Sequence, residues 1–132
     1  MDLDDLKKYF YILVAMLGLG WYVSNHYTFR DVLKYSREHP DPKRSPALDY
    51  YTGMGFFLKE DYDGAIEAFT QLLADYPTCH YAPTAMVKLG SAYTERYRFA
   101  NAREVYEKFF EEHPTHKERP AVEKRYEYIK FK

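Results

Sequence analysis

The feature that most constrains the fold of this 132-residue chain is a regularly repeated pair of prolines. Three segments of the form Pro-x5-Pro begin at Pro40, Pro77 and Pro114, so each begins 37 residues after the one before it. A fixed period of this size is typical of an array of stacked helical repeats. The first proline of each pair ends a helix and the second suits a first helical turn, because proline has no amide hydrogen. The chain is therefore predicted to be all-α.

Small and aromatic residues recur at the same spacing between the proline pairs. The matching positions are Gly53 and Gly90, Phe56 and Tyr93, Tyr62 and Phe99, Ala65 and Ala102, and Phe69 and Tyr106. This pattern resembles the tetratricopeptide repeat (TPR), which has a small residue and an aromatic on helix A, and an alanine and an aromatic on helix B. The resemblance covers two full units, 46–77 and 83–114, although Asp49 and Met86 replace the usual tryptophan.

Partial units flank these two repeats. Residues 26–39 match a degenerate B helix, and residues 120–132 provide about three turns of a closing A helix with a solvated outer face. The predicted organisation is an N-terminal segment with a transmembrane helix (1–25), a half-repeat helix and linker (26–45), two TPR units (46–119) and a capping helix (120–132). The fold expected is thus a transmembrane helix followed by a short TPR α-solenoid.

The N-terminal segment carries a run without charged side chains, from Tyr9 to Val23. Extended to residues 6–27 it would measure about 33 Å as a helix, with aromatic residues near both ends. We therefore expect a single transmembrane span. The alternatives are a signal peptide cleaved near Gly20 and a buried helix. Lys7 and Lys8 favour a cytoplasmic N-terminus, whereas the cations after the run favour the opposite orientation.

Two further resemblances suggest a location. The joint Tyr-Pro-Thr-Cys-His-Tyr-Ala-Pro (76–83) resembles that of bacterial envelope TPR proteins, which include the periplasmic coordinator of the Tol–Pal system and outer-membrane assembly lipoproteins. The layout of apolar run and repeats resembles single-span bacterial proteins whose repeats face the periplasm beside the secretion translocon. These resemblances imply a single-pass protein of the bacterial inner membrane with a periplasmic TPR domain. The only cysteine, Cys79, lies within the repeats, so no lipid attachment behind the apolar run is expected.

Motifs for chemistry are missing from the sequence. A net charge of −1 gives no reason to expect nucleic-acid binding. Phosphate-binding, haem-binding and metalloprotease motifs do not occur, so we expect no cofactor, no metal and no enzymatic activity. Two neighbouring joints hold Cys79, His80, His113 and His116, but adjacent Cys79 and His80 lack the spacing that wraps a zinc ion, and exposed joint residues are the simpler interpretation.

The remaining candidate is a binding surface. In TPR proteins the A helices line a groove for a partner, and the matching positions here are Tyr50, Met54, Phe57, Val87, Ser91 and Thr94. The alternative is that the first three are core residues covered by helix 26–39. The sequence therefore predicts a membrane-anchored adaptor or accessory subunit that binds another membrane or envelope protein. The competing hypothesis is a homo-oligomeric scaffold that stacks through Val122, Tyr126 and Ile129 of the closing helix.

Overall fold

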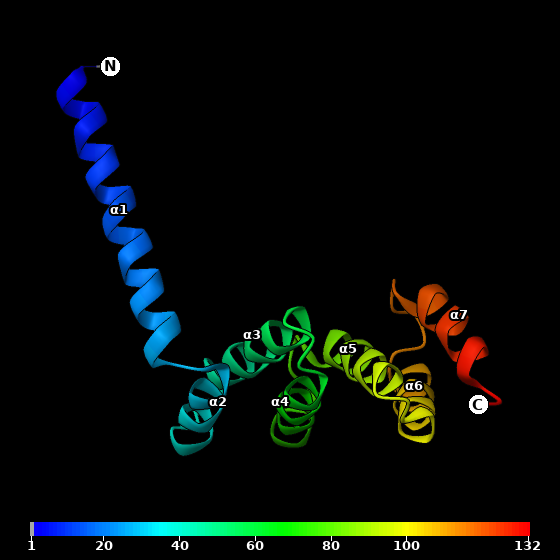
Figure 1. The fold of residues 1–132 in the computed structure, drawn as a ribbon. Helices are drawn as coiled ribbons and strands as arrows, with labels where there is room; N and C mark the ends of the chain where they lie inside the picture. Colours follow the sequence, from blue (N-terminus) through cyan, green and yellow to red (C-terminus); the bar gives the residue numbers. More distant parts are fainter. Residues whose placement is uncertain (1) are drawn as a thin grey trace.

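The computed structural model describes residues 2–132, and within these residues the secondary structure is entirely helical. Figure 1 shows that the later helices form two rows, with α3, α5 and α7 in one and α2, α4 and α6 in the other. The seven helices found in the described residues are α1 (Leu3–His26), α2 (Phe29–Glu38), α3 (Ser45–Leu58), α4 (Tyr62–Asp75), α5 (Ala82–Glu95), α6 (Phe99–Glu112) and α7 (Arg119–Ile129).

The helix boundaries follow the 37-residue period. Helix α5 begins and ends 37 residues after α3, α6 does the same relative to α4, and α7 begins 37 residues after α5. The second proline of each pair lies in the first turn of α3, α5 or α7, where its missing amide hydrogen leaves no carbonyl unpaired. The expected stop and start signals are therefore confirmed as helix boundaries.

The turn inside each helix pair also repeats. Glu60 and Tyr97, 37 residues apart, have positive φ angles of 60° and 57°. The next amide in each turn, that of Asp61 or Arg98, donates to a carbonyl near the end of the preceding A helix, at 2.9 and 2.8 Å. This geometry reverses the chain within three residues, so that α3 packs against α4 and α5 packs against α6.

Glycine allows the paired helices to approach closely. A Cβ atom placed on Gly53 would lie 2.6 Å from the ring of Phe69, and one on Gly90 would lie closer still to the ring of Tyr106. Each aromatic ring therefore lies directly against the backbone of its partner helix. Two apolar clusters result, one centred on Phe69 and its neighbours from α2 to α5, the other on Tyr106 and Phe109 with residues of α5 and α7.

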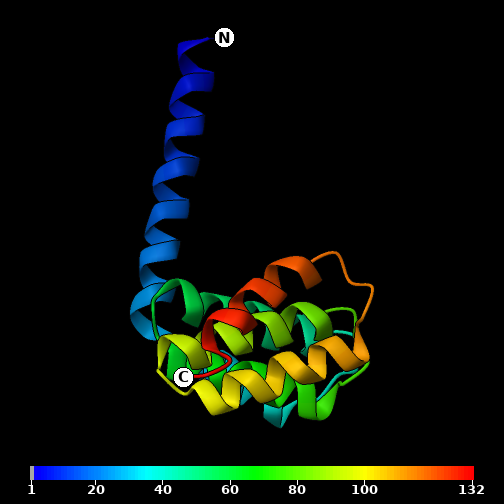
Figure 2. The same cartoon turned by 90° about the vertical axis from the view of Figure 1, so that its right-hand side faces the viewer.

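Helix α1 projects away from the array on the side of α3, α5 and α7, as both views show (Figures 1 and 2). None of its residues is buried. Thr28 begins α2 with a capping box, in which its backbone amide donates to Asp31 at 2.7 Å and its hydroxyl accepts from the Asp31 amide at 3.3 Å. The cap separates α1 from the repeats at residues 27–28.

The expected transmembrane span is wrong. No helix of the described residues combines the length and the apolar character needed to cross a membrane. The uncharged run from Tyr9 to Val23 provides only about 22 Å of helix, against a hydrocarbon core of about 30 Å. Extending it adds Lys7 and Lys8 on one side and Ser24 to His26 on the other, so length is gained at the expense of apolar character.

Candidate functional site

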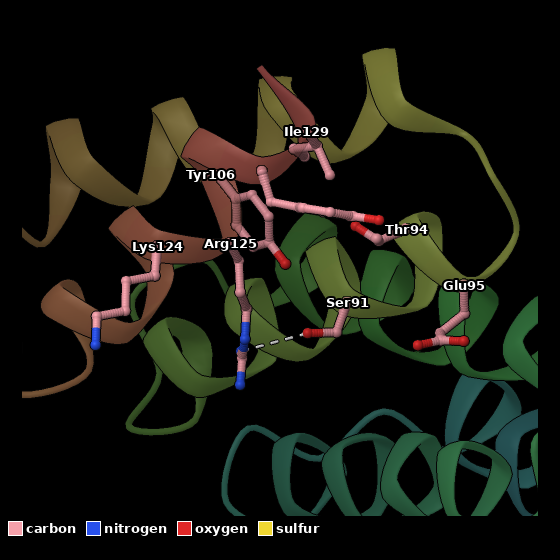
Figure 3. Close-up of a pocket in the computed structure, with 8 residues that line it drawn as sticks. Ser91, Thr94, Glu95, Tyr106, Lys124, Arg125 and Ile129 are labelled. Carbon is pink, nitrogen blue, oxygen red and sulfur yellow. Dashed lines mark hydrogen bonds between the residues drawn. The ribbon is translucent and has the colours of Figure 1, made fainter. Parts of the chain in front are cut away.

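Helices α3, α5 and α7 are the A helices of the repeats, and their row contains a pocket of about 340 Å³ between α5 and α7 (Figure 3). This volume is at the lower end of the range for ligand pockets and is sufficient for a side chain with its flanking backbone. We call it the α5–α7 pocket, and it is lined by Ser91, Thr94, Glu95, Tyr106, Lys124, Arg125, Tyr128 and Ile129.

The hydroxyl groups of α5 are held in place by their own helix. Ser91 Oγ donates to the Val87 carbonyl at 3.1 Å, and Thr94 Oγ1 donates to the Gly90 carbonyl at 2.9 Å. Each hydroxyl proton is thus engaged, and each oxygen keeps lone pairs that can accept a hydrogen bond. The α5 wall therefore presents two fixed acceptors.

Arg125 supplies a donor on the opposite wall. The residue 37 positions earlier, Lys88, places its ammonium group 5.2 Å from the centre of the Phe57 ring. The counterpart of Phe57 in the next unit is Thr94, which offers no ring. Arg125 accordingly makes only one hydrogen bond within residues 2–132, from Nη1 to Ser91 Oγ at a long 3.4 Å. Its guanidinium group keeps most of its donors free.

Tyr106 contributes a buried hydroxyl group from α6. The residue is 0% exposed, and its oxygen has no hydrogen-bond partner among the described residues. Figure 3 shows this hydroxyl directed toward the space between Arg125 and Thr94. The same figure places Lys124 and Arg125 on one side and Glu95 on the other, so the pocket is cationic at its α7 wall.

The structure places the predicted groove residues in two different environments, the α5–α7 pocket and the apolar clusters. Ser91 and Thr94 line the α5–α7 pocket, whereas Val87, 3% exposed, belongs to the second apolar cluster. Tyr50, Met54 and Phe57 are half-buried and pack against the first cluster.

Tyr50 is covered from the side of α4 and α5. Its ring stacks on Tyr81 with 4.8 Å between centres and lies 6.2 Å from Phe69. Burial, together with the neighbouring ionisable groups, raises the pKa of Tyr50. Helix α2 reaches α3 elsewhere, through Phe29 against Phe56 at 5.5 Å between ring centres. Tyr50 is therefore covered by Tyr81 and Phe69, whereas the core interpretation assigned this covering to helix 26–39.

The proposed self-association residues face their own chain. Val122 and Ile129 are almost fully buried in the second cluster with Tyr106 and Phe109. Tyr126 donates a 2.7 Å hydrogen bond to Glu107 of α6 and packs edge-on against Phe110. These contacts attach α7 to α6, so the three side chains already have partners within the monomer.

The joints do not form a metal site in the described part of the chain, where no group of three or more candidate ligands comes together. Sequence reasoning missed five of the pocket residues: Glu95, Tyr106, Lys124, Arg125 and Tyr128. A signal for two of them was present: Tyr106 has a hydroxyl that Phe69 lacks, and Arg125 faces Thr94 where Lys88 faces an aromatic ring.

Paired antiparallel helices with this period, these glycine–aromatic contacts and an A-helix pocket define a TPR-type helical-repeat protein. Residues 42–126 match the family model YfiO, outer membrane lipoprotein, which is more than half of the chain. The chain belongs to this family. A search of the curated proteins gave no significant match.

This family membership corrects the expected location. The prediction of a single-pass inner-membrane protein is wrong, because the family is one of outer membrane lipoproteins and no described helix is suited to span a membrane. The resemblance of the joints to those of envelope lipoproteins is confirmed for the repeats, which the match covers from α3 into α7.

Proposed function

We propose that this protein is a non-enzymatic adaptor of the cell envelope, which holds another envelope protein in the groove formed by its A helices. The observation that carries the proposal is the α5–α7 pocket. Its fixed acceptors, free guanidinium donors and unpartnered hydroxyl converge on a space that no part of the described chain fills. Membership in a family of envelope lipoproteins with helical repeats supports a binding role.

The self-associating scaffold is less well supported. In α3 and α5, a glycine at one position accepts the aromatic ring of the following B helix. The corresponding residue of α7 is Glu127, two periods after Gly53. A B helix packed on α7 in the same way would meet a charged side chain where α3 and α5 have a glycine, so this mode of stacking is disfavoured at α7.

Photo-crosslinking in the host cells tests the adaptor function. A photoreactive residue at Thr94 should give one discrete adduct with another envelope protein, because Thr94 lines the pocket. The matched control is the same residue at Glu111, an exposed position on α6. Equal adducts from both positions, or adducts of the protein with itself alone, would contradict the proposed function.

A further inference from the structure

We infer that the α5–α7 pocket binds an acidic side chain of the partner, with Arg125 and Tyr106 as the residues that recognise its carboxylate. This inference rests on the proposed function and names the chemistry of the ligand. It depends on three observations within residues 2–132: a buried hydroxyl without a hydrogen-bond partner, a guanidinium group without an ion pair, and a comparison between equivalent positions of the two repeats.

Comparison of equivalent positions in the two repeats shows that the hydroxyl of Tyr106 is not needed for packing. Its counterpart in the first unit is Phe69, which is also 0% exposed and also lies against a glycine. A phenyl ring is therefore sufficient for packing at this position. An unpaired buried hydroxyl destabilises a fold, since it has lost its hydrogen bonds to water. The unpaired hydroxyl is explained if it donates a hydrogen bond to a bound ligand.

The free donors of Arg125 point to the same ligand. Arginine guanidinium groups commonly bind carboxylates, often through two parallel hydrogen bonds, and the guanidinium group of Arg125 is exposed and accessible to one. Within the part of the chain that the structure describes, Arg125 has only the 3.4 Å bond to Ser91. Lys124 lines the same wall and adds positive charge.

Glu95 determines which end of the pocket receives the carboxylate. It lies across the pocket from Lys124 and Arg125 in Figure 3 and would repel an anion. The acidic group is therefore held at the α7 wall, where Tyr106 and Arg125 can both donate to it. Thr94 Oγ1 lies along the α5 wall and can accept from a backbone amide of the partner segment, and Ser91 Oγ, which accepts from Arg125, keeps a second lone pair for the same purpose.

The test uses isotopically labelled full-length protein and three blocked tripeptides, acetyl-Leu-Xaa-Leu-amide, in which Xaa is Glu, Gln or Lys. The Glu peptide should shift the amide resonances of Ser91, Thr94 and Arg125. It should bind about tenfold or more tightly than the Gln peptide, because a hydrogen bond to a charged acceptor is substantially stronger than one to a neutral acceptor. Equal binding of Glu and Gln, tighter binding of Lys, or no shifts would overturn the inference.

Two variants identify the donors. Arg125→Gln should remove the preference for Glu, whereas Lys117→Gln makes the same change of charge at an exposed joint residue and should leave it intact. Tyr106→Phe should raise the midpoint of thermal unfolding by a few degrees and weaken binding of the Glu peptide several-fold. A lower midpoint, or unchanged binding of the Glu peptide, would show that the hydroxyl serves the fold and not the ligand.

These results separate the inference from the proposed function. If Thr94 crosslinks to an envelope protein but the tripeptides show no selectivity, the adaptor function stands and the carboxylate assignment fails. If the Glu peptide binds selectively but no adduct forms in cells, the pocket chemistry stands and the adaptor function fails.

Discussion

Replacing Gly90 with alanine tests the central packing contact of the second repeat. The added Cβ would overlap the ring of Tyr106, which is fully buried. Overpacking of this kind costs about 1–3 kcal/mol. Alanine also has a better helix propensity than glycine, by up to about 1 kcal/mol. Because the overlap is more severe at Gly90 than at any other glycine of the described residues, a cost of about 2–3 kcal/mol applies, and the expected net effect is a loss of about 1–2 kcal/mol in the free energy of unfolding.

Thermal and denaturant unfolding of the full-length protein measure this loss. For a repeat domain of this size, each kcal/mol lowers the melting temperature by about 4–8 °C. Gly18→Ala is the matched control, because no atom lies within 4 Å of a Cβ added to this residue of α1. The double variant Gly90→Ala, Tyr106→Leu should recover part of the loss. A Gly90→Ala protein as stable as the unaltered one would refute the close approach of α5 and α6.

Three further predictions concern single side chains. Asp49 is buried, and burial raises its pKa above the ordinary 3.8. The carboxyl group of Asp49 therefore takes up its proton at a higher pH in the folded state than in the unfolded state, and this residue makes the protein more stable as the pH falls from 7 toward 4. Denaturant titrations of Asp49→Asn should show a higher free energy of unfolding at pH 7 and a weaker dependence on pH. Tyr97→Gly should stabilise the protein by up to about 1 kcal/mol in thermal unfolding, because φ at this position is 57° and glycine adopts positive φ without strain. Tyr126→Phe should cost less than about 1 kcal/mol in the same assay, since its hydrogen bond to Glu107 is exposed to solvent; an unfolding curve that begins with loss of α7 would indicate a larger role.

Much of the fold could be predicted because it depends on local signals. Proline fixes the helix starts, and the alternation of glycine and aromatic residues determines which faces of paired helices meet. These properties repeat with the sequence, so the 37-residue spacing alone predicts the close contacts at Gly53 and Gly90. The relation between the helix pairs is equally periodic, and for this reason the positions of α2 and α7 followed from the same spacing.

The site was less predictable because it depends on side-chain length and on departures from the repeat. Tyr50 and Val87 occupy equivalent positions, but the long tyrosine reaches partly into solvent whereas the short valine is covered by its neighbours. Arg125 faces Thr94 where Lys88 of the preceding unit faces an aromatic ring, and this departure from the repeat is not apparent from the period itself. The N-terminal prediction failed for another reason: aromatic residues at both ends suggested membrane interfaces, although the apolar run between them was too short.

The matching joints have a consequence for the size of the molecule. Because residues 46–82 form one complete period, a second copy inserted after Ala82 would preserve the spacing of the prolines and the glycine–aromatic pairs within each unit. Helices pack about 8–10 Å apart, and each inserted unit would move the pocket by about that distance from α1. The number of repeats therefore acts as a spacer that sets the reach of the protein.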